Sequence, residues 1–416
     1  MNRLRLTVAL MALVAGAAFA EAPIRFATGM PLRFDGASRI ALPGLAKAVP
    51  ARADFHLSFR MRTDGPSAGH AQLLSANAGQ PGRAEIGLSP DGPDAGKPYF
   101  WMDGGPRLVA LSRMDDGKWH EIALLRRNGR FSLMIDEFVD AEGDSDAPIC
   151  VTDRGWTLGG YVLDRTKSLF KGEISDLRIE TGVCENPAVI PVAELEKNCY
   201  DWTNRHERIL REGPGLKPQV VLIGDSITHA WADMPSIGGA DARDVWKRDF
   251  AGIRALDLGF GFDRTQNLLW RIDHGELDGL DPKVVVLLAG INNFGSRGRK
   301  LHARGNTSWE TAEGVIAVRE RIAAKLPTAH VLLMGIFPRG REKDSFYRNL
   351  PLAANALLRR KYANDPNTTY VDAWGALLDE SGYLSKEVSH DSVHLTAEGF
   401  RRWRAVLAPH LDRLLK

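Results

Sequence analysis

The chain has 416 residues, of which 44% are hydrophobic and 25% are charged, a composition typical of globular proteins. At about 150 residues per domain, this length favours two or three domains. The formal net charge of +2 lacks the basic excess of nucleic-acid-binding proteins, so no nucleic-acid partner is expected. Three cysteines exclude a disulfide-rich scaffold, and no Cys/His cluster has the spacing of a structural zinc site.

The first twenty residues have the pattern of a secretory signal peptide. Arg3 and Arg5 give a positive start, an apolar run covers 6–17, and an Ala-Phe-Ala cleavage motif ends at Ala20. The run is shorter than the roughly 20 apolar residues that span a bilayer, so a membrane anchor is not favoured. We expect residues 1–20 to be removed and the mature protein to be exported to the periplasm or beyond, without stable membrane insertion.

The three cysteines leave their pairing open. Cys150, Cys184 and Cys199 are an odd number, so at most one internal disulfide forms. A bridge between Cys184 and Cys199 would link the two sides of a domain boundary, and three buried thiols are the alternative. No basic partner lies near any of them in the sequence, so a catalytic cysteine is not indicated.

Residues 24 to about 180 predict short strands. Apolar residues alternate with polar ones over 55–61 and 131–135, the period of half-buried strands, and turn-forming clusters such as 63–66 and 90–93 separate the runs. Helical periodicity is not evident here. The region therefore predicts an antiparallel β-sandwich.

Three segments in this region carry a resemblance. The stretch "DDGKWHEIALLRRNGRFSLMIDE" (115–137), then "LGG" (158–160) and "FKGEISDLRI" (170–179), resembles the laminin-G/concanavalin A-like jelly roll. The resemblance covers about 50–180 and implies a jelly-roll domain over 21–185. Such domains often bind glycans and some hold calcium, while a spacer role is the alternative. Tyr99 and Trp101 either stack on a sugar ring or belong to the core.

The pattern changes after the sandwich. Apolar residues at three- or four-residue spacing predict a helix over 194–211, and we place the domain boundary between 183 and 196, with a linker at 186–196 and a second domain at 197–416. Buried parallel strands are predicted at 220–223, 255–258, 284–288, 331–336 and 369–371. Helices are predicted between or after them at 267–272, 311–324, 352–362 and 397–415. This alternation predicts a three-layer α/β/α domain whose ligand site lies beyond the carboxyl ends of the strands.

A serine follows the first of these strands. In "VVLIGDSITHAW" (220–231), Ser226 lies at a strand-to-helix turn, where unpaired backbone N–H groups can stabilise an oxyanion. A capped helix start, with Asp225 or Ser226 as N-cap, is the alternative interpretation. A serine nucleophile needs a base to activate it.

The base is expected near the end of the chain. In "HDSVHLTAEGF" (390–400), Asp391 precedes His394 by three residues and Thr396 is the expected N-cap of the next helix. Asp391 can therefore orient the imidazole that accepts the Ser226 proton. His390 is a less favoured base, and we expect His229 to face away from Ser226.

Two further strand ends supply hydrogen-bond donors. "LDLGFGFDRTQNLLWRI" (256–272) has a glycine-rich turn at Gly261-Phe262, and "VVVLLAGINNFG" (284–295) ends with Asn292, whose amide can donate. Each signal alone is weak, because glycine and asparagine are common in turns. Their coincidence with Ser226, Asp391 and His394 favours catalysis.

This constellation resembles the SGNH (GDSL-type) hydrolases over 200–416, in a branch similar to the catalytic subunit of platelet-activating-factor acetylhydrolase. The resemblance implies a flavodoxin-like fold, a Ser226–His394–Asp391 triad and an oxyanion hole formed by Ser226, Gly261 or Phe262, and Asn292. No metal or organic cofactor is required. Phe262 stands where many members have glycine, and Asn293 where many have aspartate.

Several polar residues next to these motifs are further candidates for the site. Asp225, Asp263, Arg264 and Asn293 are candidate substrate contacts because they adjoin the motifs. Arg264 and Arg339 either face the site or form surface salt bridges, and the surface interpretation is favoured.

Three functions are compatible with these residues. The first is an exported carbohydrate O-acetylesterase. The second is a lysophospholipase or a broad short-chain arylesterase or thioesterase, which needs an apolar acyl groove. The third is an inert glycan-binding protein, and a transacylase would use the same residues. Five aromatic side chains either line an acyl groove or form core: Trp231, Phe260, Phe262, Phe294 and Trp309.

Overall fold

A computed structural model describes residues 24–26, 31–42, 52–66, 70–76, 82–90, 92–149, 156–161, 168–182, 185–197, 200–234, 240–295 and 303–416. The chain divides into two compact units, Met1–Glu185 and Asn186–Lys416. The expected signal peptide and the three cysteines lie outside the described residues. Within those residues, no helix combines the length and apolarity that crossing a bilayer demands.

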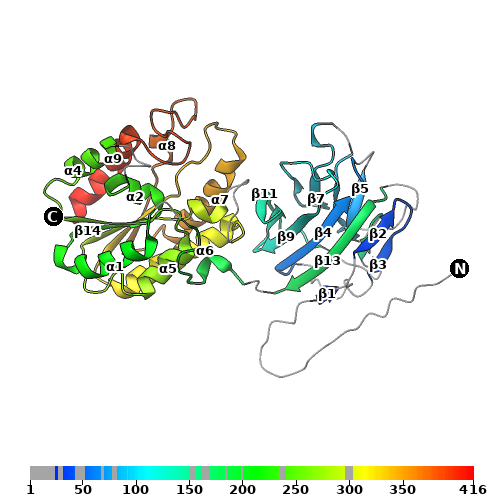
Figure 1. Cartoon of the computed structure of the whole chain (residues 1–416), viewed down its shortest axis with the longest axis horizontal. Helices are drawn as coiled ribbons and strands as arrows, with labels where there is room; N and C mark the ends of the chain where they lie inside the picture. Colours follow the sequence, from blue (N-terminus) through cyan, green and yellow to red (C-terminus); the bar gives the residue numbers. More distant parts are fainter. Residues whose placement is uncertain are drawn as a thin grey trace, which may run out of the picture. The chain divides into compact units, whose positions relative to one another are not determined.

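The first unit consists of two antiparallel sheets (Figure 1). One has the order β1-β13-β4-β9-β10-β11, with β2 also paired to β13, and the other has the order β3-β12-β5-β6-β7-β8. The strands are β1 Ile24–Phe26, β2 Leu32–Asp35, β3 Ile40–Leu42, β4 Phe55–Thr63, β5 Ala71–Ala76, β6 Ala84–Leu88, β7 Pro98–Met102, β8 Arg107–Val109, β9 His120–Arg127, β10 Arg130–Ile135, β11 Phe138–Asp144, β12 Trp156–Leu158 and β13 Lys171–Thr181. The predicted all-β jelly-roll class is confirmed.

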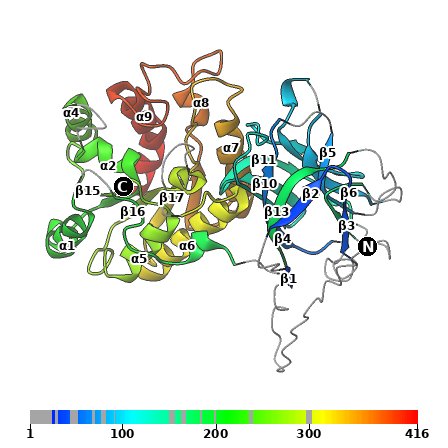
Figure 2. The same cartoon turned by 45° about the vertical axis from the view of Figure 1, so that its right-hand side comes forward.

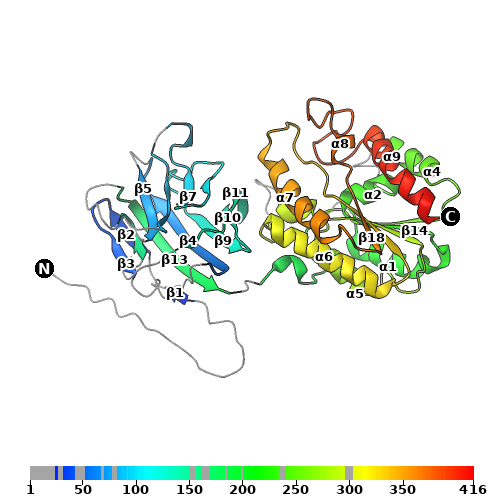
Figure 3. The same cartoon turned by 180° about the vertical axis from the view of Figure 1, so that it is seen from behind.

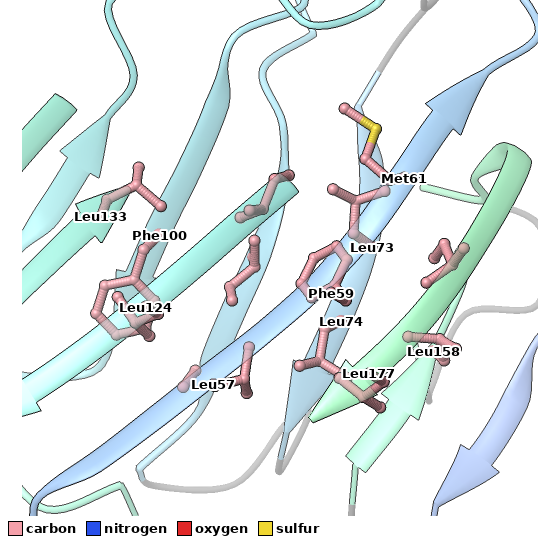
Figure 4. Close-up of a cluster of buried hydrophobic side chains, with 14 of the residues drawn as sticks. Leu57, Phe59, Met61, Leu73, Leu74, Phe100, Leu124, Leu133, Leu158 and Leu177 are labelled. Atoms are coloured by element: carbon pink, nitrogen blue, oxygen red, sulfur yellow. The ribbon is translucent and has the colours of Figure 1, made fainter. Parts of the chain in front are cut away.

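Alternating apolar side chains fill the space between these sheets. Leu57, Phe59 and Met61 point inward from β4, where every second residue is buried. They meet residues of the other sheet such as Leu74 and Phe100, as Figure 4 shows. Strand alternation therefore places one face of each sheet in the core and leaves the other for polar side chains.

The second unit contains a five-stranded parallel sheet of order β15-β14-β16-β17-β18. Its strands are β14 Val220–Gly224, β15 Ala255–Gly259, β16 Val284–Leu288, β17 His330–Met334 and β18 Thr368–Val371. The helices of this unit are α1 Trp202–Glu212, α2 Ser226–Ala232, α4 Ala240–Asp249, α5 Thr265–Asp273, α6 Ser308–Lys325, α7 Phe346–Lys361, α8 Trp374–Leu377 and α9 Ala397–Leu414. The strand order reverses beside β14, which places the expected ligand crevice at the carboxyl end of that strand.

The helices cover both faces of the parallel sheet. Figures 1 and 2 show α2, α4 and α9 on one side and α1, α5 and α6 on the other. Figure 3 shows α6 beside α7, with which it packs. The predicted α/β/α class is confirmed.

Two helices start six or more residues away from their predicted starts, while the other predicted helices start within three residues. Helix α1 begins at Trp202, because Asp201 accepts the Asn204 N–H at 2.9 Å as its N-cap. Helix α7 begins at Phe346, six residues before the predicted start, and contains Pro351. Pro351 is the sixth residue of this helix, so its missing N–H removes one i→i−4 hydrogen bond, to the Tyr347 carbonyl, and the helix continues through it.

The segment expected to be a linker packs on the second unit. A 3₁₀ turn at Pro187–Val189 begins with Asn186 as N-cap, and Ala188 is fully buried. The Ala188 carbonyl accepts from the Thr265 hydroxyl at 2.8 Å, and the Val192 N–H donates to the Gln266 carbonyl at 3.2 Å. These hydrogen bonds make residues 186–192 part of the α5 surface.

Candidate active site

Ser226 lies at the first position of α2, directly after strand β14. Asp225 is the N-cap, and its carboxylate accepts the Ile227 N–H at 2.9 Å. Helix α2 packs closely on β15. A Cβ atom added at Gly259 would lie only 2.1 Å from the backbone nitrogen of His229. Glycine at this position therefore lets the helix that carries Ser226 approach the sheet.

Ser226, His394 and Asp391 form a hydrogen-bonded chain. Ser226 Oγ lies 2.9 Å from His394 Nε2, and His394 Nδ1 lies 2.6 Å from Asp391 Oδ2. The other carboxylate oxygen, Asp391 Oδ1, accepts the N–H groups of Val393 at 3.0 Å and His394 at 2.8 Å. These hydrogen bonds, with the imidazole as partner, lower the pKa of Asp391 below its usual range. A carboxylate therefore faces the imidazole at neutral pH.

A tight turn over 390–394 positions the base. Ser392 has a φ of 72°, and its carbonyl accepts the Gly340 N–H at 3.1 Å, which ties the turn to the loop after β17. Ser389 pairs with Leu395 in an isolated β-bridge. Thr396 then caps α9 by accepting the Gly399 N–H, as the sequence predicts.

Asn292 lies in the 3₁₀ turn Ile291–Phe294 that follows β16. Its side-chain Nδ2 donates to the Asp263 carbonyl at 3.0 Å, which connects this turn to the segment after β15. The amide has two hydrogens, and this bond uses one of them. Because β14 pairs with both β15 and β16, the turns that carry Ser226, Phe262 and Asn292 emerge from three adjacent strand ends.

The Gly261–Asp263 turn has an unusual backbone. Phe262 has a φ of 64°, the left-handed region that favours glycine. Two aromatic residues bind its flanks: the Tyr200 hydroxyl donates to the Gly261 carbonyl at 3.3 Å, and Trp202 Nε1 donates to Asp263 Oδ1 at 2.7 Å. The turn is thus fixed from α1 as well as from Asn292.

The four candidate substrate contacts are buried, and the structure assigns three of them to internal hydrogen bonds. Asp263 binds Trp202 and Arg271, and Asn293 binds Thr265, Gln266 and Asn306. Arg264 donates to the carbonyls of Ala303 and Arg304 and pairs with Glu196, so it is neither a surface salt bridge nor exposed to substrate. All three support the turns that carry the site.

Asp225 differs from those three because one carboxylate oxygen has no partner among the described residues. The residue is 1% exposed, so it does not contact substrate from solvent. Burial raises the pKa of its carboxyl to about 7. Asp225 therefore lies beneath the nucleophile as a helix cap.

Two other histidines lie near the triad motifs in the sequence, His229 and His390. His229 packs against Tyr200 and Phe260, and burial lowers its pKa to about 3, so it stays neutral in the core. His390 is half exposed, and its Nε2 lies 3.8 Å from Asp391 Oδ2, so it is beside the carboxylate instead of pointing away from it. Arg339 donates to the Gly295 carbonyl at 2.6 Å, beyond the Asn292 turn.

Four of the five candidate groove aromatics are core residues. Trp231 is fully buried, with its ring 4.6 Å from that of Trp403, and Phe260 is fully buried beneath Arg271. Phe294 and Trp309 are at most 5% exposed. Phe262 alone of the five is partly exposed.

A buried polar network that was not predicted from the sequence lies beneath the site. Arg271 is fully buried between Asp263, at 2.8 Å, and Glu276, and it also donates to the Gly224 carbonyl at the end of β14. A signal existed: Arg271 interrupts an otherwise apolar helical stretch, and such a charge requires a buried partner. Asp263 and Glu276 supply that partner.

The combination of parallel sheet, nucleophile at a strand end and aligned base and carboxylate defines a serine hydrolase of the α/β/α class. Comparison with known proteins agrees. The GDSL-like lipase/acylhydrolase family model matches residues 222–402, and a concanavalin A-like lectin/glucanases superfamily model matches residues 34–189. The chain belongs to the GDSL-like lipase/acylhydrolase family, with a laminin-G-like domain before the hydrolase domain, and acts on ester bonds.

Individual relatives cover one unit each. The chain is 30% identical over 218 residues to platelet-activating factor acetylhydrolase IB subunit alpha2 of Homo sapiens, covering 52% of this chain and 86% of that protein. An acylhydrolase structure from Bacteroides fragilis is 22% identical, covering 52% of this chain and all of that one, with a TM-score of 0.41. Domain 4 of an arabinanase from Geobacillus stearothermophilus, solved with arabinotriose, is 22% identical, covering 39% and 76% with a TM-score of 0.30.

Proposed function

We propose that the protein is an exported carbohydrate O-acetylesterase that works through an acyl-enzyme on Ser226. Ser226 Oγ attacks the ester carbonyl while His394 Nε2 takes its proton, and Asp391 stabilises the imidazolium. The oxyanion is bound by the N–H groups of Ser226 and Phe262 (or Gly261) and by the Asn292 amide. His394 then protonates the leaving alcohol, and water, deprotonated by the same histidine, releases the acetate.

The observation that carries the short-acyl assignment is the burial of the candidate groove aromatics. A long acyl chain needs several apolar side chains facing the site. Trp231, Phe260, Phe294 and Trp309 are instead committed to core packing, and the partly exposed Phe262 adjoins the proposed oxyanion site. A small acyl group is therefore the best fit, and a lysophospholipase is the weaker alternative.

The carbohydrate assignment rests on the outer face of the β5–β6–β7 sheet. Cross-strand pairing places Thr157, Ser75, Glu85, Trp101 and Arg107 in one row over five strands. Thr157, Ser75 and Glu85 are buried, at most 9% exposed, whereas Trp101 is partly exposed and Arg107 is exposed. Trp101 and Arg107 therefore offer an indole and a guanidinium to the apolar face and the hydroxyl groups of a sugar.

A hydrogen-bond network organises this row. The Tyr99 hydroxyl donates to Glu85 at 3.4 Å, and Gln72 also donates to Glu85, while the Arg83 guanidinium lies 4.3 Å from the centre of the Trp101 ring. Burial raises the pKa of Glu85. The surroundings of the Trp101 ring are therefore ordered before a ligand binds, which lowers the conformational entropy cost of binding.

Hydrolysis by residues 21–416 tests the enzymatic assignment. We expect p-nitrophenyl acetate to be cleaved much faster than the octanoate ester, acetate to be released from acetylated xylan, and Ser226→Ala to lose several orders of magnitude in kcat. Preference for octanoate would favour the lipid alternative. No hydrolysis of any ester would favour the inert glycan-binding protein.

Polysaccharide binding tests the role of the sandwich. Trp101→Ala is expected to weaken retention on acetylated xylan without changing p-nitrophenyl acetate hydrolysis. Trp119, which lies beneath Arg60 and Arg62, provides the matched control, and Trp119→Ala should bind as the parent does. Equal binding by both variants would contradict the proposed sugar face.

A further inference from the structure

A second histidine lies beside the triad carboxylate. His390 Nε2 is 3.8 Å from Asp391 Oδ2, and the His390 and His394 rings are nearly parallel, with an angle of 18° between their planes. One ligand atom from each of His390, Asp391 and His394 lies within 4.8 Å of the others. No step of ester hydrolysis uses His390.

The backbone of the turn directs one oxygen to both imidazoles. Asp391 Oδ1 is occupied by the N–H groups of Val393 and His394, so Oδ2 is the atom that both rings share. His390 and Asp391 have side chains 47% and 41% exposed, so an ion can reach them from solvent.

We propose that His390, Asp391 and His394 form an inhibitory site for Zn²⁺. Two imidazole nitrogens and a carboxylate oxygen are ligands that Zn²⁺ prefers, with water in the fourth position. Tetrahedral coordination separates ligand atoms by about 3.3 Å. The observed 3.8 Å and 2.6 Å separations bracket that value, so small side-chain rotations produce the geometry.

Zinc in this position removes the base without touching Ser226. In the active tautomer, His394 Nδ1 carries the proton that binds Asp391, and the Nε2 lone pair faces Ser226 Oγ. Zinc takes the Nδ1 lone pair, so the ring proton moves to Nε2. His394 then has no lone pair for the serine proton. This consequence rests on the proposed roles of Ser226 and His394, but ion binding itself does not.

Inhibition of p-nitrophenyl acetate hydrolysis by ZnCl₂ tests the proposal in a non-chelating buffer. We expect inhibition of the parent protein that EDTA reverses. Loss of a residue that supports a metal ligand typically lowers metal affinity 10- to 100-fold. Loss of a ligand itself should lower the affinity at least as much, so we expect His390→Gln to need at least about 10-fold more zinc for half-maximal inhibition. Rates are normalised to each variant's own rate without zinc. His410→Gln, at the far end of α9, is the matched control and should respond as the parent does.

Calorimetric titration with ZnCl₂ separates binding from catalysis. Ser226→Ala should bind one ion as tightly as the parent does, because the serine is not a ligand, and His390→Gln should bind it more weakly. Equal zinc sensitivity of the parent and His390→Gln would overturn the proposal. So would absence of zinc binding by the parent, or loss of binding in Ser226→Ala, which would place the ion on the serine side.

Discussion

Replacing Asp391 by asparagine changes the tautomer of the base while preserving its shape. Asp391 Oδ1 accepts two backbone N–H groups, at 3.0 Å and 2.8 Å, so the asparagine carbonyl must take that position. Its NH₂ group then replaces Oδ2 at 2.6 Å from His394 Nδ1 and donates to it. The ring proton moves to Nε2, which faces Ser226 Oγ at 2.9 Å. A protonated Nε2 does not accept the serine proton.

The expected loss is about 10⁴-fold in kcat, or about 5.5 kcal/mol of transition-state stabilisation, with a much smaller change in KM. Stopped-flow and steady-state hydrolysis of p-nitrophenyl acetate by Asp391→Asn measure it, and circular dichroism checks that the fold is retained. His390→Gln, one residue earlier, controls for disturbance of the turn. If Asp391→Asn hydrolyses within tenfold of the parent, the assigned role of Asp391 is wrong.

Three other substitutions probe the surroundings of Ser226. Asn292→Ala should lower kcat about 10²- to 10³-fold through loss of one oxyanion donor, and near-parent turnover would remove Asn292 from the oxyanion hole. Trp202→Phe removes the N–H that donates to the buried Asp263 carboxylate at 2.7 Å. We expect the free energy of unfolding, measured in urea, to fall by about 1–3 kcal/mol and kcat to fall as well. An unchanged kcat would show that the Gly261–Asp263 turn needs no support from α1. Asp225→Asn tests pH linkage. Burial raises the pKa of Asp225 to about 7, so the folded state keeps a proton on this carboxyl that the unfolded chain loses near pH 4. The contribution of Asp225 to the free energy of unfolding therefore falls as the pH rises from about 4 to 7. Thermal melts should show the variant losing less stability than the parent over this range, and parallel pH profiles would contradict the raised pKa.

The parallel sheet was predictable because its strands are buried on both faces. The sequences of β14 and β16 are continuously apolar, which is typical of parallel strands covered by helices on both faces. The apolar runs of β15 and β18 are weaker examples of the same pattern. The chain order of the motifs then placed Ser226, Asn292 and the Phe262 turn at one sheet edge. His394 could be assigned because Asp391 precedes it by three residues, a spacing that closes one turn.

The polar core was not predictable in the same way. Asp263, Arg264 and Asn293 adjoin the motifs, and a sequence does not show whether such a side chain faces substrate or a neighbouring loop. Arg264 points away from the substrate because it donates to the carbonyls of Ala303 and Arg304, about forty residues further along the chain. Every residue has a backbone carbonyl, so the sequence does not show which carbonyls a side chain will bind. Similarly, the hydrogen bonds that attach 186–192 to α5 are made largely by main-chain atoms.

Phe262 stands where many family members have glycine, yet its backbone has a conformation that glycine favours. The residue has a bulky side chain, yet its φ of 64° is the conformation that glycine adopts without strain. For a non-glycine residue this conformation costs roughly 1–2 kcal/mol, which neighbouring interactions must offset. Here the flanking residues supply them: Tyr200 binds Gly261, and Trp202, Arg271 and Asn292 all bind Asp263. Those bonds fix the direction of the N–H that the proposed mechanism aims at the oxyanion. The Phe262 side chain is partly exposed, and in the proposed mechanism it restricts the acyl side of the site to a small group.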